Sequence, residues 1–242
     1  MTNPIAISAI IPCYNEEGNV LPLLAELVPV LQATGLAFEV VYVDDASTDG
    51  TDRRVLEAMQ TCPQLRLVSH TRNCGQSAAL LSGIAAARGE ILLTMDADLQ
   101  NDPADVPAML EAFRSCDAVT GVRRRREDST MKRLSSRIAN RFRDWVLDDG
   151  IHDAGCNYRV FRKQMMEGAV PFRGLHRFLP TLWKWQGYKV VEMTVNHRAR
   201  HQGISKYGTM NRLWVGIGDV FAMRWYRRRM VPVRRTEEGI EQ

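Results

Sequence analysis

The chain has 242 residues, of which 45% are hydrophobic and 25% are charged, and its formal net charge is +4. This composition supports a globular core, and the small charge excess does not indicate a highly basic protein. Five scattered cysteines without paired spacing argue against a disulfide framework or a zinc site, and no stretch predicts a signal peptide or a transmembrane helix.

The first half of the chain alternates between short, β-branched apolar runs and longer stretches with apolar residues at helical spacing. Repeated units of this kind predict a mostly parallel sheet with helices on both faces. The predicted strands are residues 5–12, 38–43, 65–70, 91–95 and 118–121, and the predicted helices are residues 16–32, 49–60, 76–87 and 103–113.

The second half is more basic, with a helix-like segment from Arg123 to Arg143, further strands at 157–161 and 189–195, and an amphipathic helix at 210–225. The apolar side of that last helix fits either a membrane surface or core packing. The basic segment fits either a solvated face or a surface for an acceptor phosphate and anionic lipid. Nucleic-acid binding is disfavoured, because acidic residues elsewhere would repel a phosphate backbone.

Two pairs of carboxylates follow predicted strands at the points where the strands end. Asp44 and Asp45 follow the second strand, and Asp96 and Asp98 follow the fourth. In an open α/β sheet, this carboxyl edge is where ligands bind. Carboxylates beside a core need a compensating cation, and a divalent ion carrying a diphosphate fits because hard cations bind oxygen ligands. The alternative is an acidic surface turn.

The first predicted strand ends in Pro12-Cys13-Tyr14-Asn15-Glu16, without the glycines of a dinucleotide-binding turn. Tyr14 offers a ring for stacking, and Glu16 offers an acceptor for a base or ribose. The alternative is a helix start that Asn15 caps. Both interpretations are compatible with this segment lying at the same sheet edge as the two carboxylate pairs.

Taken in order, these segments resemble family 2 glycosyltransferases, and especially the branch of dolichyl-phosphate mannosyltransferase and the bacterial polyprenyl-phosphate glycosyltransferases. The resemblance covers residues 5–225. The family motifs are Ile11–Glu16, Asp44–Thr51, Asn73–Gly75 and Met95–Gln100, and the branch is indicated by Asp98–Gln100 with Asp102–Pro103, by Gly121–Arg123 and by Arg200–Tyr207.

The resemblance implies a GT-A fold, which is a Rossmann-like α/β fold with a mostly parallel central sheet, as a catalytic domain over residues 1–209. Residues 210–242 would form an amphipathic helix and a basic tail without transmembrane helices. The implied nucleotide-sugar ligands are Pro12, Tyr14, Glu16, Asp44, Asp45, Asp96, Ala97 and Gln100. The implied ligands of Mg²⁺ or Mn²⁺ are Asp96, Asp98 and Gln100, and the implied catalytic residues are Asp98, Arg123, Arg200 and Lys206.

The implied reaction is an inverting transfer of a sugar, with GDP-mannose as the first expectation for the donor, to a polyprenyl (dolichyl or undecaprenyl) phosphate. A lipid phosphate is already ionised near neutral pH, so it needs positioning by Arg and Lys and no general base. The alternatives are UDP-glucose or another UDP-sugar as donor, a soluble or growing glycan as acceptor, and a non-catalytic subunit of a membrane complex.

We expect a cytoplasmic protein at the inner face of the membrane, held there peripherally or by a small membrane-protein partner, that binds no nucleic acid. Gly203–Tyr207 is predicted to be a loop that closes over the donor, with a plain surface turn as the alternative. The segment Asp153–Arg159 matches the family pattern Asp-x-x-x-Gly-Phe-Arg only loosely, because Asn157 stands where a small residue is expected.

Overall fold

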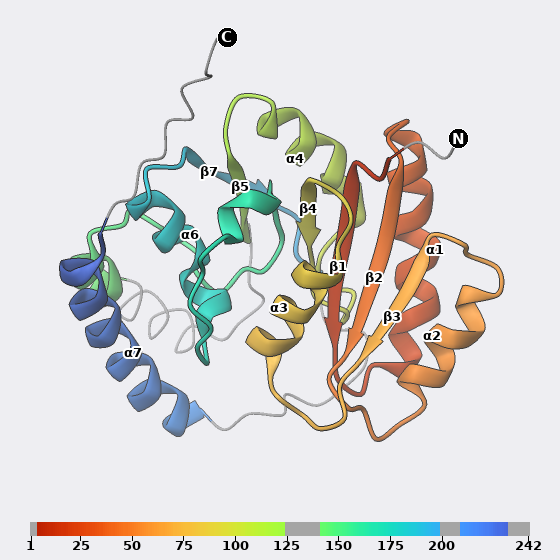
Figure 1. Ribbon diagram of the computed structural model, residues 1–242, viewed down its shortest axis with the longest axis horizontal. Helices are drawn as coiled ribbons and strands as arrows, with labels where there is room; N and C mark the ends of the chain where they lie inside the picture. Colours follow the sequence, from red (N-terminus) through yellow and green to blue (C-terminus); the bar gives the residue numbers. More distant parts are fainter. Residues whose placement is uncertain (1–3, 124–140, 199–208, 232–242) are drawn as a thin grey trace, which may run out of the picture.

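The computed structural model describes residues 4–123, 141–198 and 209–231, which form a seven-stranded sheet with helices packed against it (Figure 1). The sheet order is β3-β2-β1-β4-β6-β5-β7, and only β6 runs antiparallel to its neighbours. The strands are β1 (Ile7–Cys13), β2 (Phe38–Asp44), β3 (Leu65–Ser69), β4 (Ile91–Thr94), β5 (Ala118–Arg123), β6 (Arg159–Arg162) and β7 (Val190–Val195).

The helices are α1 (Glu17–Ala33), α2 (Thr51–Met59), α3 (Gln76–Ala86), α4 (Val106–Phe113), α6 (Leu175–Trp185) and α7 (Thr209–Arg229), with 3-10 turns η1 (Pro103–Asp105) and η2 (Lys163–Met166). Residues 141–147 are also helical. In the first half, every predicted strand and helix is confirmed, with ends that differ by at most three residues; the largest difference is at the start of α4, where residues 103–105 form η1. Helix α1 continues through both Pro22 and Pro29.

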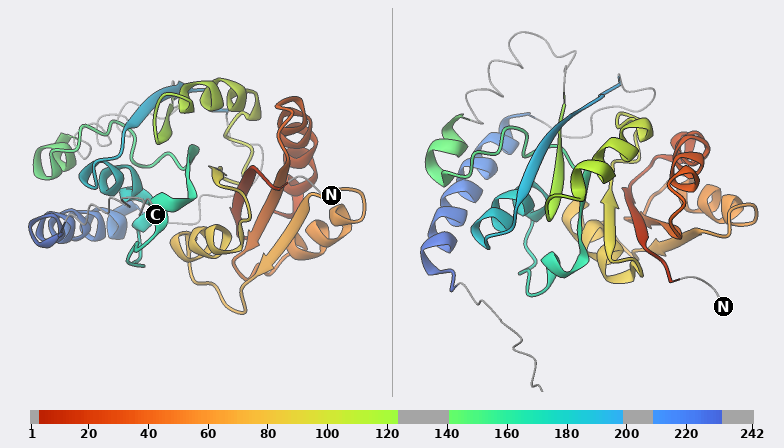
Figure 2. Two further views of the ribbon diagram at one scale, coloured as in Figure 1. Left: turned by 45° about the horizontal axis from the view of Figure 1, so that its top comes forward. Right: turned by 90° about the horizontal axis from the view of Figure 1, so that it is seen from above.

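Helices cover both faces of the sheet (Figure 2). On one face, α1, α2 and α4 contribute Leu27, Val55 and Met109 to the larger core cluster. On the other face, α3 and α6 contribute Leu80 and Trp183 to a second cluster. All seven residues of β2 are buried. Because both faces are covered, the central strands are continuous apolar runs, which is why the sequence predicted them.

Helix α6 was not predicted from the sequence. Its buried residues Leu175, Phe178, Leu179 and Trp183 nevertheless repeat at helical spacing, so the signal was present. Pro180 lies inside the helix and removes one backbone N–H, which normally argues against a helix at this point. The contact that compensates for this loss comes from β6 and is described below.

Helix α7 packs against α6 and residues 141–147 through a third cluster that includes Val146, Val220 and Met223. Core packing is therefore confirmed for Val220 on the apolar side of the predicted amphipathic helix. The helix extends four residues beyond its predicted end. Phe221 and Trp225 are instead 54% and 61% exposed. Among the described residues, no helix combines the length and apolar character needed to cross a membrane.

Candidate active site

The carboxyl ends of β1, β2 and β4 meet at one edge of the sheet. Cys13 lies beside Asp44 in the register of β1 and β2, and the backbone N–H of Asp45 donates to the carbonyl oxygen of Cys13 over 2.9 Å. The N–H of Met95 donates to the carbonyl of Ile10 over 3.3 Å. The structure thus brings the loops with the predicted acidic and aromatic residues to one edge, as parallel strand order requires.

Asn15 connects the loop after β1 to the loop after β2. Its N–H donates to Ser47 Oγ over 2.8 Å, and its Oδ1 accepts from the N–H of Thr48 over 2.7 Å. Its φ of 56° lies in the left-handed region that Asn tolerates. Helix α1 follows Glu16 without a side-chain cap. The alternative that Asn15 caps this helix is therefore wrong, because its side chain is engaged by Thr48.

The predicted nucleotide ligands of this first loop are positioned at the edge but only partly buried. Pro12, Tyr14 and Glu16 are all half-buried. Glu16 Oε2 accepts a hydrogen bond of 2.6 Å from Nδ2 of Asn19, which lies on the first turns of α1. Their roles towards a nucleotide stay predictions.

Asp44 and Asp45 are both buried, and each organises a different loop. Asp44 accepts hydrogen bonds from the N–H and the hydroxyl of Ser47. Asp45 accepts from the N–H groups of Cys74 and Gly75 over 2.8 and 2.7 Å. Their predicted contact with the nucleotide stays a prediction, and the structure adds a role in shaping this edge.

His70 lies between Asp45 and Ser82. Its Nδ1 is 2.7 Å from Asp45 Oδ1, and its Nε2 is 2.8 Å from Ser82 Oγ. With the sulfur of Cys74, these residues also bring three potential metal-ligand atoms within 4.8 Å of one another. Because the Asp45 carboxylate already accepts two backbone N–H groups and the imidazole, we interpret the cluster as a brace for the loop at 70–75.

Asp96 and Asp98 lie directly after β4. Asp98 is buried, and its Oδ1 accepts from the N–H of Gln100 over 3.2 Å. Asp96 Oδ1 accepts from Gln76 Nε2 over 3.0 Å and from Asn157 Nδ2 over 3.2 Å. These amide side chains come from the start of α3 and from the loop before β6, and neither was identified from the sequence as a site residue.

Burial, together with the nearby charge of Asp98, raises the pKa of Asp96 to about 6, although the hydrogen bond from Asn157 opposes this shift. A raised pKa of Asp96 indicates that the neighbouring protein groups supply less than full compensation for its negative charge. A divalent cation would supply it, since carboxylate oxygens one residue apart are suitable ligands for Mg²⁺ or Mn²⁺. The donor set of Asp96 and Asp98 therefore fits such an ion.

Arg123, at the end of β5, pairs with Asp153 through two hydrogen bonds. Its Nε lies 2.7 Å from Asp153 Oδ2, and its Nη2 lies 2.6 Å from Oδ1. Burial alone would lower the pKa of Arg123, but the hydrogen bonds and charge of Asp153 raise it above its usual value. The cation predicted to meet phosphates is thus held in one orientation near Asp96.

Arg159 is fully buried on β6, and the sequence analysis assigned it no role. Its Nη1 donates over 2.7 Å to the carbonyl oxygen of His176, four residues before Pro180. Pro180 has no N–H to bond this carbonyl, so the guanidinium takes the place of the missing helical hydrogen bond. Burial lowers the pKa of Arg159 to about 10, while the charge of Asp96 opposes that shift.

Gln100 joins the site to the segment after β7. Its carbonyl oxygen accepts from the N–H of Arg198 over 2.9 Å, and its Nε2 lies 3.4 Å from the carbonyl of Arg198. Arg198 also pairs with Asp102 at 2.7 Å and with Glu26 at 2.6 Å. These contacts hold Arg198 against Gln100, two residues after Asp98, whereas metal binding by Gln100 stays a prediction.

The remaining predicted site residues divide into two groups. Ala97, which stands between Asp96 and Asp98 in the sequence, is buried. Arg200 and Lys206, with the loop that carries them, lie outside the described residues, as does most of the basic segment after Arg123.

Comparison with known proteins places these motifs in a family context. The family model "Glycosyl transferase family 2" matches residues 8–168. A dodecaprenyl-phosphate galacturonate synthase of Rhizobium johnstonii is 33% identical over 236 residues, which cover 93% of this chain and 68% of the relative. An undecaprenyl-phosphate 4-deoxy-4-formamido-L-arabinose transferase of Pseudomonas paraeruginosa is 35% identical over 210 residues, which cover 86% of this chain and 62% of the relative.

A solved structure shares the fold. Glucosyl-3-phosphoglycerate synthase from Mycobacterium tuberculosis, in complex with Mg²⁺ and UDP, superposes with a TM-score of 0.71 at 19% identity, covering 94% of this chain and 80% of that chain. The predicted GT-A fold is confirmed by this likeness and by the observed sheet. The chain spans about two thirds of the length of the curated relatives that it matches.

Proposed function

The chain belongs to glycosyl transferase family 2, and on this premise we propose that it transfers a sugar from a nucleotide sugar to a polyprenyl phosphate. The observation that carries the proposal is the pair Asp96 and Asp98 at the carboxyl end of β4, with Arg123 held nearby. The acceptor is supported by relatives named for dodecaprenyl phosphate and undecaprenyl phosphate.

We infer that Asp96 and Asp98, together with Gln100, hold a divalent ion when the donor binds. Such an ion would stabilise the negative charge that develops on the leaving diphosphate. The protein contributes by orienting Asp96 through Gln76 and Asn157, so the carboxylate does not need to reorganise during the reaction.

The cationic residues would position the two phosphates. Arg123 is already oriented by Asp153, and the sequence adds Arg200 and Lys206. A phosphate monoester is ionised near neutral pH and is therefore a competent nucleophile without proton removal. Positioning by Arg and Lys is then the main requirement on the acceptor side, and attack opposite the leaving group inverts the sugar carbon.

The donor has two candidate classes. The sequence resemblance led to GDP-mannose, whereas the relatives named above transfer galacturonate and a formamido-arabinose, and the similar solved structure binds UDP. These names favour a UDP-linked sugar over GDP-mannose. We propose that the reaction occurs at the cytoplasmic membrane face. A polyprenyl phosphate is anchored in a membrane by its apolar chain, and the exposed Phe221 and Trp225 suit peripheral contact, directly or beside a small membrane protein.

The test uses the purified full chain, Mg²⁺ or Mn²⁺, undecaprenyl phosphate and a panel of radiolabelled donors. The panel contains GDP-mannose, UDP-glucose, UDP-galacturonate and UDP-4-deoxy-4-formamido-L-arabinose. We expect label to enter the organic-extractable lipid with one donor and to disappear when EDTA is added. Donor binding without label in the lipid, together with label in a soluble acceptor, would contradict the proposed acceptor.

A further inference from the structure

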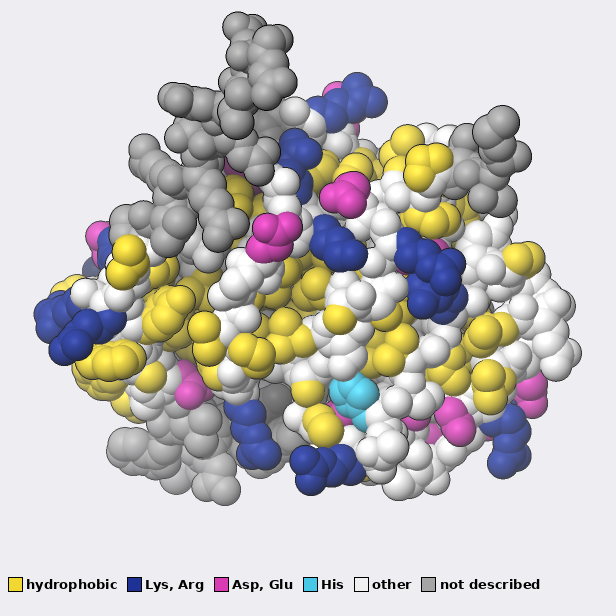
Figure 3. All heavy atoms as spheres, in the orientation of Figure 1, with side chains coloured by type: hydrophobic (Ala, Val, Ile, Leu, Met, Phe, Trp, Pro, Cys, Tyr) yellow, Lys and Arg dark blue, Asp and Glu magenta, His cyan; other side chains and the backbone are white. Residues whose placement is uncertain are grey.

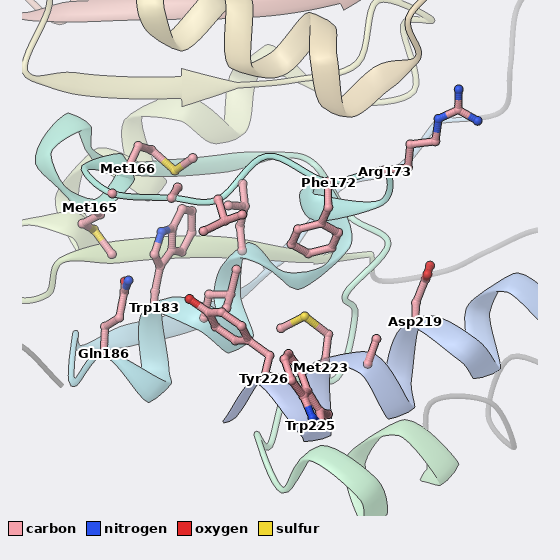
Figure 4. Close-up of a pocket in the computed structure, with 16 residues that line it drawn as sticks. Met165, Met166, Phe172, Arg173, Trp183, Gln186, Asp219, Met223, Trp225 and Tyr226 are labelled. Carbon is pink, nitrogen blue, oxygen red and sulfur yellow. The ribbon is translucent and has the colours of Figure 1, made fainter. Parts of the chain in front are cut away.

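An apolar pocket of about 370 Å³ lies between α6, α7 and the segment at 165–173 (Figure 4). Its walls include Met165, Phe172, Trp183, Met223 and Tyr226. The thioether side chains of methionine adapt to irregular apolar ligands, and aromatic rings provide large contact surfaces. This pocket is separate from the acidic pair after β4, and no contact described above accounts for it.

One end of the pocket is connected to the candidate active site through the start of α3. Figure 4 shows Phe172 and Asp219 at one end and Met165 and Gln186 at the other. Just after Phe172, the N–H of Gly174 donates to Ser77 Oγ over 3.0 Å. Ser77 follows Gln76, which donates to Asp96. The Phe172 end is therefore fixed to the same turn of α3 that orients the Asp96 carboxylate.

Charge is arranged unevenly around the pocket. Asp219 supplies its one carboxylate among the described lining residues, and Arg177 compensates this charge at 3.1 Å. Arg173 is exposed at the Phe172 end and points away from the pocket in Figure 4. A ligand with an apolar tail and an anionic head would therefore have its head near Arg173 and the active-site edge, and its tail along the pocket.

The outer side of α7 links the pocket to a surface suited to lipid. Phe221 and Trp225 are exposed on this helix, and Trp225 also lines the pocket. The helix ends in Arg227, Arg228 and Arg229, and hydrophobic side chains gather over this part of the molecule (Figure 3). Exposed aromatic residues followed by clustered arginines are typical of a helix at an anionic membrane surface.

We propose that this pocket binds the isoprene units nearest the phosphate of the acceptor lipid, an inference that rests on the proposed polyprenyl-phosphate acceptor. An apolar cavity of about 150 Å³ binds one benzene molecule, so a pocket of this volume has room for about fifteen carbon atoms, or about three isoprene units. The remainder of the lipid leaves the pocket beside Trp225 and stays in the membrane.

Binding of short phosphates tests the pocket without relying on transfer. The probes are farnesyl phosphate, with three isoprene units, and dimethylallyl phosphate, with one, each titrated calorimetrically into the full chain. We expect at least tenfold tighter binding of farnesyl phosphate. Ala222→Trp fills the pocket from an exposed position on α7 and should reduce this preference at least tenfold. Val170→Trp fills the pocket from the opposite rim, and it replaces Ala222→Trp in the test if that variant misfolds.

Ala108→Trp is the matched control, since Ala108 is also an exposed helical alanine and lies on α4, which packs on the other face of the sheet. This variant should keep the wild-type preference. Equal binding of both probes by the wild type, or an unchanged preference in both pocket variants, would overturn the inference. A wild type that is a dimer and pocket variants that are monomers would identify this face as an interface between copies and would also overturn the inference. Failure of wild-type transfer with every donor would count against the proposed function alone.

Discussion

Nδ2 of Asn157 donates a hydrogen bond of 3.2 Å to Oδ1 of Asp96. Asn157 stands where the sequence resemblance led us to expect a small residue, and its amide contacts a predicted metal ligand. Gln76 donates to the same oxygen over 3.0 Å. Two elements far apart in the sequence therefore orient one carboxylate, and Asn157 acts as a positioning residue in this chain.

Replacing Asn157 with Leu should shift the pH dependence of the reaction. The hydrogen bond from Asn157 lowers the pKa of Asp96, so its loss should raise that pKa above about 6. Asp96 must be ionised to bind a cation. As the solution is acidified, the variant should therefore lose activity at a higher pH than the wild type does. The measurement is kcat/KM for the donor between pH 5 and 8 at limiting metal. Gln64→Leu is the control and should keep the wild-type pH profile. Coincident pH profiles of Asn157→Leu and the wild type would contradict the role of Asn157 as a positioning residue.

Replacing Asp98 with Ala should lower transfer at least about a hundredfold, because the divalent ion that would stabilise the leaving diphosphate loses one of its proposed ligands. The side chain is buried at the sheet edge, so the melting temperature is measured alongside to establish that the variant folds. Calorimetric titration with Mn²⁺ in the presence of UDP should show weaker metal binding. Normal turnover with unchanged Mn²⁺ affinity would remove Asp98 from the metal site.

Asp45→Ala should destabilise the protein by about 2 kcal/mol, since the N–H groups of Cys74 and Gly75 lose a charged acceptor. For a chain of this size, the melting temperature should fall by about 4–8 °C. Asp52→Ala, at an exposed position at the start of α2, should change it by less than about 2 °C. Equal melting temperatures for the two variants would show that Asp45 does not brace the loop.

Alkylation with iodoacetamide at pH 8 should modify Cys74 first, because it is the exposed thiol among the five cysteines. Burial raises the pKa of the thiols of Cys13, Cys116 and Cys156, which keeps them protonated and protected. Peptide mapping over time identifies the order. Cys74→Ser should eliminate the fast phase, and rapid labelling of Cys156 in the folded protein would contradict the described burial.

Lys206→Ala should lower kcat by about ten- to a hundredfold, because the sequence predicts that this cation meets a phosphate when the loop closes. Arg53→Ala, on the exposed side of α2, is the control for loss of one positive charge. Donor and acceptor kinetics are measured separately. Unchanged kinetics in Lys206→Ala would exclude the predicted loop from the mechanism.

The sequence by itself determined the β–α alternation, the sheet type and the edge where the site lies. Buried parallel strands such as β2 are continuous apolar runs, and the acids that follow them are adjacent in the chain, so local pattern was sufficient. The motifs Asp44–Thr51 and Met95–Gln100 also indicated the family, because each lies within one strand-to-loop transition.

Only the tertiary structure decided which side chains orient those acids. Asn157 and Gln76 reach Asp96 from 61 and 20 residues away. Arg159 donates a hydrogen bond to the carbonyl oxygen of His176, to which Pro180 cannot donate. Likewise, the pocket beside Phe172 and Met223 exists because α6 and α7 pack together. Contacts of this kind depend on which elements become neighbours in space, and the periodicity of a single segment carries no information about its neighbours.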